Sequence, residues 1–144
     1  MKMVVRIAVV VAISMMFSAA LFAQSNDSDY VIVANKALPG SAIDVNTLKD
    51  VYQREATVWK HNEAEIVPVD LYTAGSFYEN VFGKSYIDMQ LQWVKMRNDR
   101  SLNAPVAVKD ATAVKQVVAA NKDAIGFIKA SDVDDSVKVI KLID

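Results

Sequence analysis

The sequence predicts an α/β fold, with a mainly parallel or mixed sheet of about four to five strands flanked by helices. Short apolar runs rich in β-branched residues alternate along the chain with segments whose apolar residues recur at helical spacing. The expected strands are residues 30–34, 66–69, 106–108, 124–128 and 137–142. Pro68 in the second of these runs favours a place at the end of a strand or at the edge of the sheet.

The first 23 residues have the pattern of a cleaved signal peptide. Lys2 and Arg6 give a positive start, and residues 7–22 form an apolar run that only two serines interrupt. A membrane-spanning helix needs about 20 apolar residues, and no charged cluster follows this run, so an uncleaved anchor is the less favoured alternative. We expect cleavage after Ala23, export to the periplasm or beyond, no stable membrane insertion afterwards, a disordered start over 24–29 and one domain over 30–144.

Composition excludes several classes of function. The chain contains no cysteine, so thiol catalysis and thiolate metal sites are absent. Loss of Lys2 and Arg6 with the signal peptide leaves 14 of the 16 basic side chains against 17 acidic ones, a net charge of −3. That balance argues against nucleic acids and anionic membrane surfaces as partners.

Catalytic and metal-binding patterns are missing from the sequence. His61 is the only histidine, and it lies in a polar connection beside Lys60 and Asn62, where a solvated loop histidine is expected. Four glycines stand singly at 40, 75, 83 and 126, so no glycine-rich phosphate loop exists. The acidic residues at 132, 134 and 135 lack the glycine and distal glutamate of a calcium loop. We expect no enzymatic activity, no cofactor and no metal.

Four helices are expected between the strands. Asp44 caps a helix that continues to Arg54, a second begins near Ser76 and ends at Gly83, a third begins at Ser85, and Asp110 caps a fourth. In the third helix Ile87, Leu91 and Val94 are predicted to form the buried stripe, and residues 97–104 to form a polar loop. The predicted core is Val69, Phe82, Leu91, Trp93, Val114, Val117, Ile125 and Phe127.

One turn has the features of an anion site. Residues 73–76 connect a predicted strand to a predicted helix, and free backbone N–H groups at such a junction favour anions. Thr73 precedes Gly75, which would allow close approach of a ligand, and Ser76 would add a hydroxyl. The alternative is an ordinary helix cap made by Ser76. Arg97 and Arg100 would either assist the anion or solvate a loop.

Taken in order, the segments from Val45 to Ile128 resemble a known family. Trp59, the strand at 66–69, Trp93 and the run Asp-Ala-Ile-Gly-Phe-Ile at 123–128 follow the pattern of phosphate-type periplasmic substrate-binding proteins in their short PBP-like version. The resemblance implies a single-lobe periplasmic-binding-protein-like domain. It also implies capture of a ligand, typically phosphate, for an ABC importer.

The sequence departs from that family at the residues that hold the anion. Tyr72 stands where the family has an arginine, Phe77 and Tyr78 replace a Gly-Thr pair, and Glu79 takes the place of a basic residue. Gln53-Arg54 stands where the family has Phe-x-Gly. Two functions therefore stay open. One is an exported solute-binding-like protein that takes a phosphate-like oxyanion and contacts an ABC permease; the other is a ligand-free interaction protein that contacts a transporter, a sensor or another envelope component.

Overall fold

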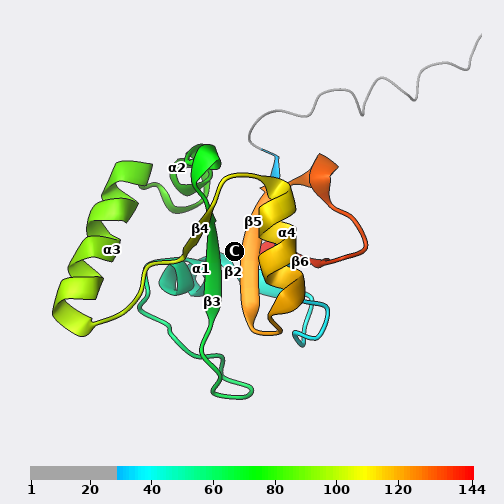
Figure 1. The fold of residues 1–144 in the computed structure, drawn as a ribbon, viewed down its shortest axis with the longest axis horizontal. Coiled ribbons are helices and arrows are strands. Elements are labelled where there is room, and N and C mark those ends of the chain that lie inside the picture. The colour runs from blue at the N-terminus through cyan, green and yellow to red at the C-terminus, as the bar shows by residue number, and fades with distance from the viewer. Residues whose placement is uncertain (1–28) are drawn as a thin grey trace, which may run out of the picture.

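Six strands form one mixed sheet, with α4 on one face and α1 on the other (Figure 1). The computed structural model describes residues 29–144, so the predictions for the signal peptide and for residues 24–28 lie outside the described residues. The strands are β1 (Tyr30–Ala34), β2 (Ala42–Asp44), β3 (Val67–Leu71), β4 (Val106–Val108), β5 (Ala124–Lys129) and β6 (Lys138–Ile143). The helices are α1 (Val45–Tyr52), α2 (Ser76–Phe82), α3 (Tyr86–Arg100) and α4 (Ala111–Ala120), with 3₁₀ turns η2 (Tyr72–Ala74) and η3 (Ala130–Asp132).

In the strand order β2-β6-β1-β5-β3-β4 only β1 runs opposite to the others, so the carboxyl ends of the neighbouring strands β5, β3 and β4 lie at the same end of the sheet. β3 is parallel to both β4 and β5, whereas β1 is antiparallel to β5 and to β6. Residues that follow β3, β4 and β5 therefore meet on the same side of the sheet, where open α/β sheets bind their ligands.

The sheet corrects one prediction. It has six strands rather than four to five, because the three residues of β2 pair with β6 immediately before α1 begins. So short a strand, with only Ala42 and Ile43 apolar, gives no pattern that a sequence can show. Pro68 is the second residue of β3, which agrees with the expected place at the end of a strand, and β3 itself lies inside the sheet. β4 begins to pair with β3 only at Val69, one residue after the proline.

The core lies on both faces of β5, whose residues alternate between the two. A Cβ on Gly126 would contact Val114 of α4, whereas the neighbouring ring of Phe127 stacks on Phe77 of α2 with 3.8 Å between centroids. Val117 is only half-buried, because Val118 takes the inner position beside it. The predicted core residues that are buried are Val69, Phe82, Trp93, Val114, Ile125 and Phe127.

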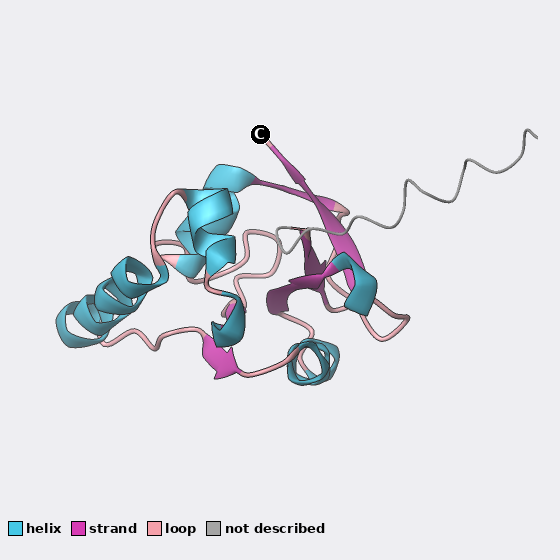
Figure 2. Ribbon diagram, turned by 90° about the horizontal axis from the view of Figure 1, so that it is seen from above, coloured by secondary structure: helices cyan, strands magenta, loops and turns pink. Residues whose placement is uncertain are grey.

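The predicted buried stripe of α3 is wrong. Ile87, Leu91 and Val94 are 67%, 63% and 57% exposed. The inner face instead carries Met89 and Trp93, and the indole Nε1 of Trp93 donates a 2.7 Å hydrogen bond to the carbonyl of Tyr52. The large rings decide which face is buried, because an indole offers more apolar area and a polar atom that finds its partner inside. Figure 2 shows α3 at the periphery of the molecule.

Helix ends follow the local sequence closely. Asp44, Ser85 and Asp110 each accept a hydrogen bond from the backbone N–H three residues later, and Gly83 ends α2 with a left-handed φ of 71°. Two boundaries differ from the prediction. α1 ends at Tyr52 rather than Arg54, and α3 continues through Arg97 to Arg100, where a loop was expected. Within residues 29–144, no helix combines the length and the apolar character needed to cross a membrane.

Candidate functional site

The predicted anion-binding turn lies at the carboxyl end of β3. The 3₁₀ turn η2 follows the strand and continues into α2, so the chain is helical from Tyr72 onward. Gly75 occupies the N-cap position of α2, Ser76 is its first residue, and no side chain caps the helix. Ser76 is therefore not the cap that the alternative interpretation required. Its side chain is exposed, as is that of Thr73.

Gly75 approaches another part of the same chain. A Cβ added to Gly75 would stand 2.9 Å from the Cβ of Tyr86, the first residue of α3. A Cβ contact under 3.0 Å is essentially not observed, so only glycine fits here without a shift. The absence of a side chain at position 75 thus serves the packing of α2 against the start of α3.

The two predicted arginines lie away from this turn. α3 has 15 residues and so spans about 22 Å, with Tyr86 against Gly75 at one end and both arginines in the last turn. Arg100 donates to a Glu55 carboxylate oxygen at 3.2 Å. Arg97 lines a separate hollow of about 210 Å³ beside Trp93. The structure does not bring Arg97 or Arg100 to residues 73–76.

A polar cavity of about 260 Å³ lies at the carboxyl ends of β3, β4 and β5. Thr73 is the one predicted site residue that lines it, and its hydroxyl donates to the carbonyl of Lys109 at 2.9 Å. This bond joins the residues that follow β3 to those that follow β4. The lining residues are Tyr30, Leu71, Thr73, Ala74, Lys109, Asp110, Ala111, Lys129 and Asp132.

Charges of both signs face this polar cavity. Lys109 directly follows β4, and Lys129 is the last residue of β5. The carboxylate of Asp110 accepts the backbone N–H of Ala113 at 2.8 Å and so caps α4. Asp132 belongs to η3. Sequence reasoning missed both lysines, although their position immediately after predicted strands, on the side where parallel strands end, was a usable signal.

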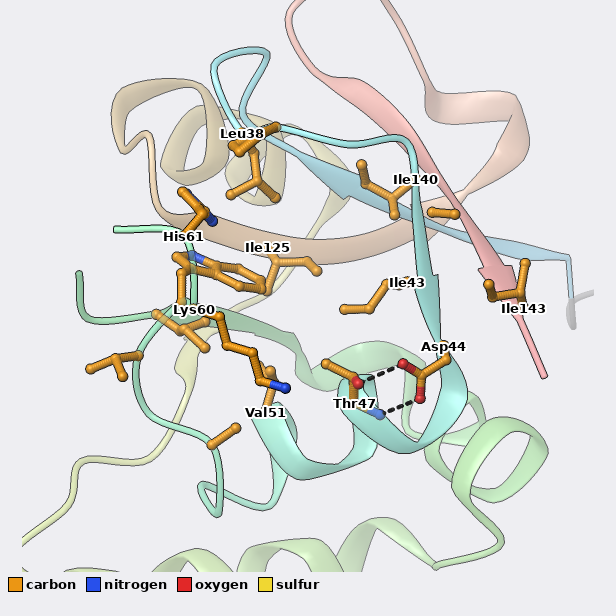
Figure 3. Close-up of a pocket in the computed structure, with 16 residues that line it drawn as sticks. Leu38, Ile43, Asp44, Thr47, Val51, Lys60, His61, Ile125, Ile140 and Ile143 are labelled. Carbon is orange, nitrogen blue, oxygen red and sulfur yellow. Dashed lines mark hydrogen bonds between the residues drawn. The ribbon is translucent and has the colours of Figure 1, made fainter. Parts of the chain in front are cut away.

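A larger cavity of about 420 Å³ opens over α1, on a different part of the molecule (Figure 3). Its walls come from β2, β5, β6, α1 and the connection that follows α1, and most of them are aliphatic. His61 lies at this cavity, exposed as expected, with its ring stacked on Trp59 at 6.2 Å between centroids and 28° between planes.

The buried carboxylate of Asp70 is the most strongly enclosed acid among the described residues. Asp70 is 1% exposed, and its two oxygens accept hydrogen bonds from the hydroxyls of Tyr78 at 2.7 Å and Tyr86 at 2.6 Å. Burial raises the pKa of Asp70 above its ordinary value, and the two hydroxyls oppose that shift. Since each tyrosine begins or belongs to a different helix, the cluster ties α2 and α3 to β3.

Residues 29–144 contain no group of three or more histidines or carboxylates placed to hold a metal ion. Among the three clustered aspartates, Asp134 pairs with the ammonium of Lys115 at 2.8 Å and accepts from Ser136. Among the described residues, Lys115 and Ser136 are therefore the partners of Asp134 in this acidic turn.

Solved structures with a similar fold exist. The chain superposes on an ABC-type phosphate transport receptor from Vibrio cholerae with a TM-score of 0.61 and 26% identity, over 79% of this chain and 46% of that one. A Clostridium perfringens protein described as a phosphate ABC transporter substrate-binding protein with bound phosphate superposes with a TM-score of 0.62 and 26% identity. The match covers 81% of this chain and 46% of that one. PstS from Borrelia burgdorferi gives 0.60 over 79% and 47%, at 14% identity, which concerns the fold alone.

The structure therefore confirms the predicted resemblance and the fold class. The chain is similar to phosphate ABC transporter substrate-binding proteins, and it spans about half the length of the solved structures it matches, which is a single lobe. No family model matches the sequence, and no curated protein matches it.

Proposed function

We propose that this chain is an exported, single-lobe solute-binding module that takes a small phosphate-like oxyanion in the polar cavity. One observation carries the proposal. In a chain that shares its fold with a protein holding bound phosphate, two lysines face a cavity at the carboxyl ends of three parallel strands. Lysine ammonium groups are common partners of phosphate oxygens.

The turn at 73–76 forms one side of this proposed site. Thr73 lines the cavity through its position after β3, and Gly75 and Ser76 lie directly behind it on the way into α2. Lys109 and Lys129 supply the positive charges for the anion, a role that the sequence predicted for Arg97 and Arg100. Lys109 is exposed, and Asp110 and Asp132 face the same cavity, so affinity is expected to be modest and to fall as salt rises.

Calorimetry with phosphate and sulfate at low ionic strength tests this function. We expect heat with at least one of the anions, together with amide chemical-shift changes at Thr73, Gly75, Ser76 and Lys109. Lys109→Gln should weaken binding, whereas Lys95→Gln, which removes an exposed charge from α3, should not. Absence of heat with both anions, with no shift at these amides, would exclude the oxyanion site.

Export is part of the proposal and has a direct measurement. A chain of 144 residues that is cut after Ala23 begins at Gln24 and loses Lys2 and Arg6. The intact mass and the first residue of the protein recovered from the periplasm decide the point. A full-length product that stays with the membrane fraction would contradict cleavage.

A second function, that of an interaction protein, is favoured by α3. Ile87, Leu91 and Val94 form an exposed aliphatic stripe along one side of this helix, and such patches often mark contact surfaces. The partner would be a transporter, a sensor or another envelope component. A photo-crosslinking residue at position 91 should then capture a single protein in the expressing cell, whereas one at the exposed position 99, on another side of the same helix, should capture it less. Equal yields at both positions would remove this alternative.

A further inference from the structure

We propose a second binding site in the cavity over α1, which would hold a medium-chain aliphatic carboxylate with its alkyl chain inside and its head group at Lys60. This α1 cavity is distinct from the polar cavity at the strand ends, and the two share no lining residue. The inference thus goes beyond the proposed function and does not depend on it.

The interior of the α1 cavity is aliphatic on several sides. Figure 3 shows Ile125 of β5 and Ile140 of β6 on the sheet side, Val51 of α1 opposite them, Leu38 at one end, and Ile43 between the sheet and α1. Val51 and Ile125 are fully buried, so these walls belong to the folded core. An alkyl chain that enters the cavity gains free energy in proportion to the apolar area of the chain that leaves water.

A few polar side chains line the cavity beside the aliphatic ones: Asp44, Thr47, Trp59, Lys60 and His61. Lys60 extends toward Val51 and Thr47 in Figure 3, and its ammonium makes no hydrogen bond or ion pair within residues 29–144. His61 flanks it, with its ring against Trp59. An unpaired ammonium beside an apolar hollow is suited to an anionic head group.

Asp44 also lines this cavity, but both of its carboxylate oxygens are engaged. One accepts the backbone N–H of Thr47 at 2.9 Å, and the other accepts the Thr47 hydroxyl at 2.6 Å. These bonds hold the pKa of Asp44 below its ordinary value, so it stays charged as the cap of α1. Asp44 is thus engaged as the cap of α1, and Lys60 is the lysine that lines this cavity. Repulsion from Asp44 limits the affinity that a carboxylate can reach.

The volume sets the length of the chain that fits. A cavity of about 420 Å³ has room for roughly a dozen heavy atoms, since each water of the liquid occupies about 30 Å³. Decanoate, which has ten carbons including that of its carboxylate and twelve heavy atoms in all, matches this size. Ligand cavities in proteins are of this order and likewise combine apolar walls with a few polar groups.

Trp59 reports directly on occupancy, because its indole lines the α1 cavity and the other tryptophan, Trp93, does not. The protein is purified from cells that express the whole chain and is titrated with hexanoate, octanoate and decanoate below their micelle concentrations. We expect saturable changes in Trp59 emission at one site per chain, with affinity rising about 15-fold for each two methylenes added. The Trp59→Phe variant should bind, by calorimetry, without the emission change.

The charge is tested with matched ligands and variants. Lys60→Gln should lower the affinity for decanoate by about threefold to fivefold and leave decanol binding unchanged, whereas Lys95→Gln should alter neither. Lys60 is exposed, so the variant is expected to fold. Phosphate should not compete with decanoate, which separates this site from the polar cavity. The inference is overturned if decanoate gives no saturable signal, if decyltrimethylammonium binds as tightly, or if affinity does not increase with chain length.

Discussion

Gly75 and Tyr86 are in direct contact, with only 2.9 Å between the Tyr86 Cβ and the place where a Cβ of residue 75 would stand. The hydroxyl of the same tyrosine donates to the buried carboxylate of Asp70 at 2.6 Å. The start of α3 is therefore held both against the start of α2 and to the carboxyl end of β3. This packing fixes the position of the turn that precedes α2, whatever that turn binds.

Gly75→Ala should destabilise the protein by about 1–3 kcal/mol, because the added methyl group must displace the Tyr86 backbone or ring. The φ of Gly75 is −58°, so alanine meets no backbone strain there and the whole effect is steric. Urea unfolding of both proteins measures it. Ser76→Ala, at the next and exposed position, is the control and should change stability by less than about 0.5 kcal/mol. Equal midpoints for all three proteins would mean that residue 75 and Tyr86 are not in contact.

Asp70 should make the protein less stable as pH rises. Its pKa is raised in the folded state by burial, so the folded chain keeps this proton at pH values where the unfolded chain has lost it. The contribution of Asp70 to stability is thus complete below the ordinary value of 3.8 and is lost as pH increases through the raised folded-state pKa. Other carboxylates act in the opposite direction, so the difference in unfolding free energy between wild type and Asp70→Asn isolates this group.

That difference should shift in favour of Asp70→Asn as the pH increases above 3.8. Asparagine has no charge, keeps an acceptor oxygen for one of the two tyrosine hydroxyls, and presents its NH2 to the other hydroxyl, which can accept. Asp70→Ala leaves both hydroxyls without this acceptor and should be about 1–3 kcal/mol less stable than Asp70→Asn at any pH, since neither variant titrates here and an unpaired buried polar group loses its hydration without compensation. A difference between wild type and Asp70→Asn that does not vary with pH would contradict the raised pKa.

Most of the helix ends and strands were predicted from local patterns in the sequence. Features that depend on contacts between distant segments were not. Asp44, Ser85, Asp110 and Gly83 mark helix ends through contacts with their own near neighbours, and the run at 124–128 is a strand wherever it lies in a sheet. The orientation of α3 depended instead on a choice between two apolar faces. Periodicity favours the stripe with Leu91, but the structure buries the face with Trp93.

The candidate site was predicted in part for the same reason. Thr73 lines the polar cavity because a residue that follows a parallel strand is placed by local connectivity. Arg97 and Arg100 lie in the last turn of α3, a helix length away from residues 73–76. The sequence predicted a loop over 97–104, and a loop could have brought these side chains back to the turn. Lys109 and Lys129 come together only through the pairing of β3 with both β4 and β5, which is a property of the sheet order.

Arg54 provides a test of backbone strain. It has a left-handed φ of 62°, a conformation that glycine adopts freely and other residues do not. Its buried guanidinium holds this position by donating to the carbonyls of Asn103 at 3.0 Å and Ile66 at 3.4 Å. Arg54→Ala and Arg54→Gly both lose these bonds and should both be destabilised. The glycine variant should be the more stable of the two by about 1 kcal/mol. If alanine and glycine give the same unfolding midpoint, residue 54 is not left-handed.

Phe127 and Leu91 were both predicted to lie in the core, and they form a matched pair for a stability test. Phe127 is buried as predicted, whereas Leu91 is exposed. Phe127 is 0% exposed, lies between Phe77 and Tyr52, and stacks on Phe77 at an interplanar angle of 9°. Phe127→Ala should therefore cost about 3–5 kcal/mol, the sum of lost burial and the cavity left among these rings. Leu91 is 63% exposed on α3, so Leu91→Ala should change stability by less than about 0.5 kcal/mol. Denaturant unfolding with an unchanged m-value measures both. A large loss for Leu91→Ala in the isolated protein would show that its side of α3 is covered in solution, whereas a small loss for Phe127→Ala would contradict its place in the core.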